Sequence, residues 1–282
     1  MEQDGLQIVP LRTTEVGVPL FCVHAGGGDA FGYRALAAAM PKDQAVYAFS
    51  PPELRRTNQF PTVEELASIY LNDVRKIQRQ GPYQICGQSF GGLVAYEMAS
   101  QLLGEGEVVH LVALFDTLHP AYCRNLPAKR LFNFHVTYLG DRFKKYAGNL
   151  LSGRLDYVVA DALRLLRRNI TRVAWQATHL AARALNRPIP EVMHTNALLF
   201  DAAWRVYTPK RFRGKLVLFR SETRTPEYND DLTLGWRVCS PDIEVHIVPG
   251  DHVTMMKPPH VTNLVDKLTP YLVDLVGRES AG

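Results

Sequence analysis

The chain places a serine between two glycines in the run GQSFG, residues 87–91, which follows a short apolar stretch and precedes a helical pattern. A strand that turns this sharply into a helix has no room for side chains two positions before and after the serine, which accounts for both glycines. The turn leaves Ser89 at the amino end of a helix, where free N–H groups favour a developing negative charge. The run predicts that Ser89 is a nucleophile. The alternative is that the glycines only let a strand pack closely against a helix.

A serine hydroxyl becomes an effective nucleophile only when a nearby base removes its proton. Of the nine histidines, His252 lies in the loop PGDHVTMM after the predicted strand 244–248, where hydrolases with this serine motif carry their base. His246 lies inside that strand, and His260 follows two prolines just before the predicted terminal helix. We therefore predict that His252 is the general base.

An acidic side chain must orient the imidazole and stabilise its charged form. Asp116 follows the predicted strand 108–115, and Glu222 follows the predicted strand 215–219. Both residues fit the chain order of serine, acid and histidine. The pattern by itself leaves the choice between Asp116 and Glu222 open.

A tetrahedral intermediate of acyl transfer needs two N–H donors directed at its oxyanion. The residue after the nucleophile, here Phe90, normally supplies one donor, and a glycine-rich loop after an early strand supplies the other. The loop HAGGG, residues 24–28, follows the predicted strand 19–23 and is predicted to fill that role. Neither GxGxxG nor a terminal GK[ST] is present, which argues against phosphate binding by these glycines.

The elements that must position these residues alternate between strands and helices. Apolar runs predict strands at 19–23, 45–49, 83–86, 108–115, 215–219 and 244–248, and helical patterns lie at 33–40, 62–80, 91–103 and from about 261. Strands that are apolar throughout and separated by helices indicate a mostly parallel α/β sheet with helices on both faces. Between them, residues 121–209 show helical, arginine-rich and aromatic patterns without a convincing strand. We predict a core of residues 1–120 and 210–282 with residues 121–209 inserted as a helical lid.

The charge of the chain is unevenly placed. Residues 121–210 carry fifteen Lys or Arg and five Asp or Glu, a net charge of +10, which leaves −6 for the remainder. This asymmetry indicates an anionic partner for the middle segment, and the alternative is that the charges lie on solvated faces of amphipathic helices.

Other classes of protein are disfavoured by the composition. Of 282 residues, 46% are hydrophobic and 21% are charged, as in an ordinary globular protein. The four cysteines form no CxxC pair and show no metal-ligand spacing, which suits a reducing compartment. No secretory signal and no apolar run of membrane-spanning length is visible. We expect a cytoplasmic protein without a metal, a nucleic-acid partner or a membrane partner.

Four separated runs resemble the thioesterase domains that release products from nonribosomal peptide and polyketide synthases, which belong to the α/β-hydrolase superfamily. These runs are PLFCVHAGGGDAFGYRALAAAM at 19–40, TVEELASIYLNDVRKIQRQGPYQICGQSFGGLVAYEMASQL at 62–102, HLVALFDT at 110–117 and PGDHVTMM at 249–256. The resemblance covers about residues 16–120 and 213–275, and the motifs agree in order and spacing.

The resemblance implies an α/β-hydrolase fold in which Asp116, rather than Glu222, is the catalytic acid and Gly26 supplies the second oxyanion N–H. It implies that the insertion is a lid over an acyl-binding cavity. It also implies that an acyl or peptidyl carrier protein presents the thioester on a phosphopantetheine arm, so we expect no other cofactor.

We therefore predict a serine thioesterase that releases an acyl or peptidyl chain by hydrolysis or macrocyclisation. The run GPY…GQSFGG…AYEMA is closer to the integrated, product-releasing type than to the separate editing type. No phosphopantetheine-accepting serine motif is visible, so we expect either an excised domain or a freestanding enzyme. The alternatives are an editing, acyl-CoA or small-ester hydrolase of the same fold, and a non-catalytic binding protein, which would not need Ser89, His252 and the glycine-rich loop together.

Overall fold

The computed structural model describes residues 7–14, 17–52, 61–124, 146–148, 151, 155–185, 200, 203–224 and 231–273. Its centre is a seven-stranded sheet of order β1-β3-β2-β4-β5-β6-β7. The strands are β1 (Ile8–Arg12), β2 (Leu20–Val23), β3 (Val46–Phe49), β4 (Tyr83–Gln88), β5 (Val109–Phe115), β6 (Leu216–Ser221) and β7 (Ile243–Val248). The pairs from β3 across to β7 are parallel, which confirms the predicted mostly parallel sheet.

The strand β1 was not predicted from the sequence. It pairs antiparallel with β3 at the edge of the sheet, and its register shifts between Pro10 and Arg12. Proline has no N–H to donate and is tolerated at sheet edges. With five residues of mixed burial, β1 lacks the continuous apolar character of the inner strands.

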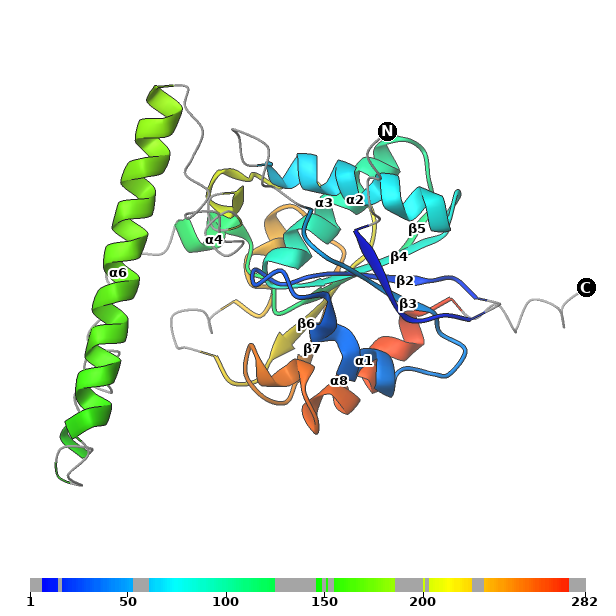
Figure 1. Cartoon of the computed structure of the whole chain (residues 1–282). Coiled ribbons are helices and arrows are strands. Elements are labelled where there is room, and N and C mark those ends of the chain that lie inside the picture. The colour runs from blue at the N-terminus through cyan, green and yellow to red at the C-terminus, as the bar shows by residue number, and fades with distance from the viewer. Residues whose placement is uncertain are drawn as a thin grey trace, which may run out of the picture.

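Helices cover both faces of the sheet. In Figure 1, α2 (Val63–Ile77) and α3 (Phe90–Gly104) lie on one face, and α1 (Arg34–Ala39) and α8 (His260–Leu268) lie on the other. Side chains along β2 alternate between the two layers, since Phe21 and Val23 join the core under α2 and α3 while Leu20 and Cys22 join the core under α1 and α8. Each inner strand is buried on both faces and therefore reads as an uninterrupted apolar run.

The helix boundaries follow local signals in the sequence. Thr62 and Glu65 form a capping box at the start of α2, with Glu65 N donating to Thr62 Oγ1 at 3.2 Å and Thr62 N donating to Glu65 Oε2 at 2.8 Å. At the other end of the chain, α8 ends at Leu268, and Pro270 lies in a short 3-10 helix at Thr269–Tyr271. A proline cannot continue the hydrogen-bonding of an α-helix, which explains this end.

The predicted lid, residues 121–209, is described only in part. It includes most of α4 (Pro120–Arg124) and the long helix α6 (Leu155–Ala184), which stands apart from the sheet and its covering helices in Figure 1. Near the end of the predicted lid, Phe200, Ala203 and Tyr207 are buried in the core on the α3 face. The remaining residues of the segment lie outside the described residues, so coverage of a cavity by this segment stays a prediction.

Several apolar side chains of α6 are exposed to solvent, namely Leu155, Val159, Leu163, Leu166, Ile170 and Val173. Among the described residues, no helix is both long enough and apolar enough to cross a membrane.

Candidate active site

Ser89 lies at the junction of β4 and α3 in a strained backbone conformation. Its φ of 55° and ψ of −120° fall in a region that residues with a side chain rarely adopt, at a typical cost of about 1–3 kcal/mol. The Ser89 N–H donates to Phe115 O at 3.0 Å, which holds this position against the end of β5. Because α3 begins at Phe90, the N–H groups of its first turn have no partner within the helix.

The glycines around Ser89 are required by backbone contacts. A Cβ at Gly87 would lie 2.2 Å from Gly91 O, and one at Gly91 would lie 2.3 Å from Val23 O. These distances confirm that the turn excludes side chains at both positions. Gly92 is a third such position, which the pentapeptide pattern did not include, since a Cβ there would lie 2.0 Å from Thr117 Oγ1.

Asp116 follows β5 and is buried. It also has a left-handed backbone, with φ 50°. Its Oδ2 accepts a hydrogen bond from His252 Nδ1 at 2.7 Å. Its Oδ1 accepts from Ser221 N at 2.8 Å and from Arg224 Nη1. The structure therefore brings Asp116 and His252 together, although 136 residues separate them in the chain.

The charge state of Asp116 fixes the tautomer of His252. Burial alone would raise the pKa of the Asp116 carboxyl, but the hydrogen bond from His252 and the charge of Arg224 outweigh it and hold this pKa below its ordinary value. An ionised carboxylate only accepts hydrogen bonds, so Nδ1 of His252 carries a proton. In the neutral imidazole, Nε2 then keeps a free lone pair.

Glu222, the alternative acid, is placed differently. Its side chain is exposed, and its backbone N–H donates to Val248 O at 2.8 Å beyond the end of β6. Within the described residues, Asp116 rather than Glu222 contacts the His252 imidazole.

Two sets of hydrogen bonds hold the loop that carries His252. Gln88, the residue before Ser89, donates from Nε2 to His252 O at 2.7 Å. Asp251 Oδ1 accepts from Val253 N at 2.9 Å and from Thr254 N at 2.8 Å, which closes the turn directly around His252. The Ser89 and His252 side chains themselves, both among the described residues, share no hydrogen bond, although the link through Gln88 keeps the histidine loop beside the serine turn.

The glycine-rich loop is anchored by its histidine. His24 Nε2 lies 2.6 Å from the Tyr70 hydroxyl, and His24 Nδ1 lies 2.8 Å from Ala25 O. Burial lowers the pKa of His24 to about 4, so the ring is neutral near pH 7. A neutral ring must donate to Ala25 O through Nδ1 and accept the tyrosine proton at Nε2. This assigns His24 a structural role in the loop rather than a role as base.

The glycine-rich loop lies directly against the turn at Ser89. A Cβ on Gly26 would lie 3.9 Å from Phe90 Cβ, so the two predicted oxyanion donors are neighbours. The Phe90 ring stacks on Phe200, with 4.6 Å between centroids, and Phe200 also packs against His24 at 5.0 Å. The arrangement places the predicted nucleophile Ser89, the Asp116–His252 pair and the two predicted oxyanion segments at the carboxyl edge of the sheet.

Sequence reasoning missed three residues at this site: Gln88, Arg224 and Gly92. The GG pair after the motif could have indicated Gly92. Nothing in the local pattern marked Gln88 or Arg224, because their partners are distant in sequence.

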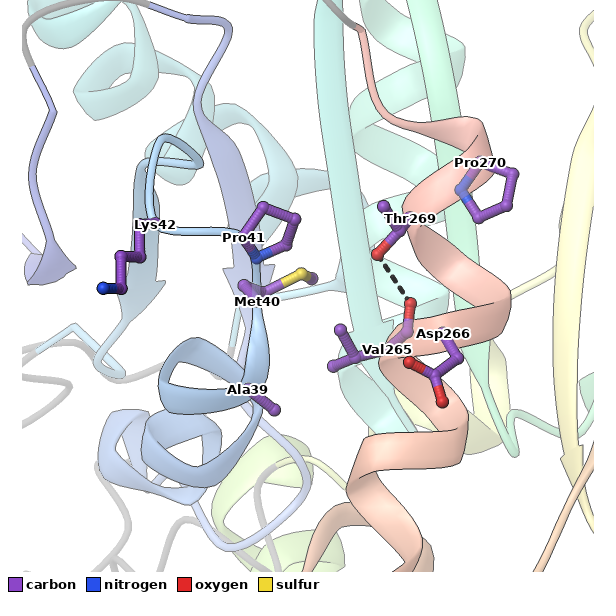
Figure 2. A pocket seen from close by; sticks show the side chains of 8 residues that line it. All are labelled: Ala39, Met40, Pro41, Lys42, Val265, Asp266, Thr269 and Pro270. Carbon is purple, nitrogen blue, oxygen red and sulfur yellow. Dashed lines mark hydrogen bonds between the residues drawn. The ribbon is translucent and has the colours of Figure 1, made fainter.

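A surface pocket of about 480 Å³ lies elsewhere, between the carboxyl ends of α1 and α8 (Figure 2). Because α1 ends at Ala39 shortly before β3 begins at Val46, this pocket lies toward the amino ends of the parallel strands. Its lining contains Lys42 and Asp266 but no serine or histidine, and it is separate from the candidate site. In the part of the chain that the structure describes, no group of three or more His, Cys, Asp or Glu could hold a metal ion.

Comparisons with known proteins identify the family of the chain. A family model of the thioesterase domain matches residues 18–272. Malpibaldin synthetase from Mortierella alpina is 40% identical over 270 residues, which cover 91% of this chain and 4% of that protein. Microperfuranone synthase from Emericella nidulans is 39% identical over 271 residues, which cover 90% of this chain and 28% of that protein. The chain spans between 3% and 9% of the length of the first three curated relatives that it matches.

The fold is also similar to solved structures. The NocB thioesterase domain, in a covalent complex with a fluorophosphonate nocardicin G analogue, superposes with a TM-score of 0.63 at 25% identity. The superposition covers 94% of this chain and 98% of that one.

Proposed function

The chain belongs to the thioesterase domain family, and we propose that it releases an acyl or peptidyl chain held as a phosphopantetheine thioester on a carrier protein. The regions that it matches are segments of larger synthetases and synthases, which is consistent with chain release in biosynthesis. A carrier domain or carrier protein is the partner that would present such a thioester.

In the proposed mechanism, His252 Nε2 accepts the proton of Ser89 as Oγ attacks the thioester carbonyl. The N–H groups of Phe90 and Gly26 stabilise the oxyanion. The C–S bond then breaks, the proton passes from His252 to the leaving thiolate, and Ser89 remains as an ester.

A second attack releases the product. Water, or a hydroxyl or amine of the bound chain, attacks the ester carbonyl while His252 again takes the proton. The proton returns to Ser89 Oγ as the ester bond breaks. Water gives a free acid, and an internal nucleophile gives a ring.

One observation carries this proposal: the buried Asp116 carboxylate accepts from His252 Nδ1 at 2.7 Å, beside a serine held at φ 55°. This pairing leaves the other imidazole nitrogen free to act as a base. A binding protein would gain nothing from a strained serine beside an oriented histidine.

Intact-protein mass spectrometry tests the proposal. The chain and its Ser89→Ala variant are each incubated with a panel of carrier-bound acyl and peptidyl thioesters. We expect acyl adducts on the unaltered chain and none on the variant. An equal adduct on both proteins would refute Ser89 as the nucleophile, and faster turnover of small soluble esters than of carrier-bound thioesters would favour a general ester hydrolase.

A further inference from the structure

We infer that Arg224 is a positioning residue that fixes the Asp116 carboxylate and sets the charge of the Asp116–His252 pair. The inference deepens the proposed function, because it rests on His252 acting as the general base. Arg224 Nη1 donates to Asp116 Oδ1, and His252 Nδ1 donates to the other oxygen, Oδ2. The Asp116 carboxylate therefore lies between the Arg224 guanidinium and the His252 imidazole.

Because this ion pair is buried, its charges interact more strongly with each other and with neighbouring groups than the charges of an exposed pair would. The Arg224 side chain is 7% exposed and the Asp116 side chain is 0% exposed. By contrast, the ion pair of Arg75 and Glu105 has side chains that are 36% and 52% exposed. Solvent and salt screen an exposed pair strongly and a buried pair weakly.

The contacts also lock the rotation of the carboxylate. Ser221 N and Arg224 Nη1 both donate to Oδ1, which leaves Oδ2 with His252 as its donor. A rotation of the carboxylate would break all three contacts. Removal of Arg224 leaves Oδ1 with the Ser221 N–H alone, so the carboxylate loses its strongest restraint.

The charge of Arg224 acts on His252 through the carboxylate. A negative Asp116 stabilises the imidazolium, and a positive Arg224 beside it opposes that stabilisation. Without Arg224, His252 should therefore hold its proton to higher pH. Two unit charges separated by one carboxyl group and partly screened by the protein should give a shift of about one pH unit.

Other charged or titratable groups lie near these three side chains or act on their neighbours. Asp251 interacts with His252, and His260 lies beside Gly250, two residues before His252. Tyr122 and Asp231 act on Arg220 in β6, and Glu222 is an exposed residue just after that strand. Arg220 is a second buried cation whose charge acts on both Asp116 and Arg224. All these groups stay in place in the variants below, so a change between variants reports Arg224.

The test follows the imidazole directly by nuclear magnetic resonance. Protein labelled with 13C in histidine is titrated, and the His252 signals are assigned by their loss in His252→Ala. We expect Arg224→Gln to raise the titration midpoint of these signals by about one pH unit, while Arg224→Lys, which keeps the charge, leaves it nearly unchanged. The acid limb of kcat/KM for thioester turnover should move by the same amount. Arg75→Gln, which breaks the exposed ion pair, is the matched control and should move neither.

A second pair of variants covers the case in which Arg224→Gln fails to fold. Asp116→Asn is compared with the double variant Asp116→Asn/Arg224→Gln, which removes both buried charges and leaves none unpaired. We expect the midpoint of His252 to be about one pH unit higher in the double variant than in Asp116→Asn.

An unmoved midpoint in either comparison, even with lowered thermal stability, would show that Arg224 is only structural and would overturn the inference. The titration does not depend on turnover. An inactive but normally titrating protein would therefore count against the proposed function and leave the inference standing.

Discussion

Replacement of Asp116 by asparagine should abolish most of the catalytic rate, and the structure gives the reason. Oδ1 of Asp116 faces two donors, the Ser221 N–H and Arg224 Nη1, so the amide oxygen of the asparagine must take that place. The amide nitrogen then faces His252 Nδ1 and donates to it. This forces the imidazole proton onto Nε2, where the lone pair for the Ser89 proton is needed.

The expected loss is about 10⁴-fold in the acylation rate constant, the size seen when a triad histidine is held in the wrong tautomer. It corresponds to about 5 kcal/mol of lost transition-state stabilisation. Pre-steady-state acylation by a soluble thioester measures it, and circular dichroism checks the fold. Glu222→Gln is the matched control and should stay within about twofold of the unaltered chain, because the Glu222 side chain is exposed and does not contact His252. A large loss in the Glu222 variant with a mild one in the Asp116 variant would refute the reasoning.

Gly91→Ala should lower the free energy of unfolding by about 3 kcal/mol or more, because its Cβ would lie 2.3 Å from Val23 O. Gly104→Ala should instead raise the free energy of unfolding by up to about 1 kcal/mol, because a Cβ there would meet no atom within 4 Å. Urea denaturation compares the two, and equal effects would contradict the steric account. Ser89→Ala should leave the thermal midpoint nearly unchanged while removing every acyl adduct, and a large drop in the midpoint would mean that the hydroxyl supports the fold. Because the pKa of Asp116 is held below its ordinary value, its ionisation should stabilise the fold above about pH 4 and lose that contribution as pH falls further. The midpoint temperature of thermal unfolding should therefore fall less steeply in Asp116→Asn than in the unaltered chain as pH is lowered from 6 to 3. Parallel curves for the two proteins would contradict this.

The parts of the fold that were predicted from the sequence are those with local causes. The inner strands are continuous apolar runs because both of their faces are buried, and the turn at Ser89 needs glycine because Gly87 and Gly91 approach backbone atoms. The start of α2 follows from two side chains three residues apart. Each of these signals is readable within a few residues of the chain.

The contacts that the sequence did not reveal join residues that are far apart. Arg224 meets Asp116 across 108 residues, and Gln88 meets His252 across 164. Asp116 and Glu222 follow neighbouring strands, β5 and β6, so the chain order could not distinguish them. The family resemblance favoured Asp116, and the structure supplies the physical difference, because the Asp116 side chain is buried against His252 and Glu222 is exposed.

The sheet itself explains how two strained residues can be held at one site. Ser89 N donates to Phe115 O at 3.0 Å, and Asp116 N donates to Phe219 O at 2.8 Å, so each residue is hydrogen-bonded to the next strand of the sheet. Both residues then turn into a left-handed conformation directly after the end of their strand. Strain of about 1–3 kcal/mol at each position persists only where the surrounding structure fixes the backbone, and the paired strands β4, β5 and β6 do so here. Ser89 and Asp116 are therefore positioned by the paired strands of the sheet, so we expect changes confined to residues 155–185 to leave the Asp116–His252 pair intact.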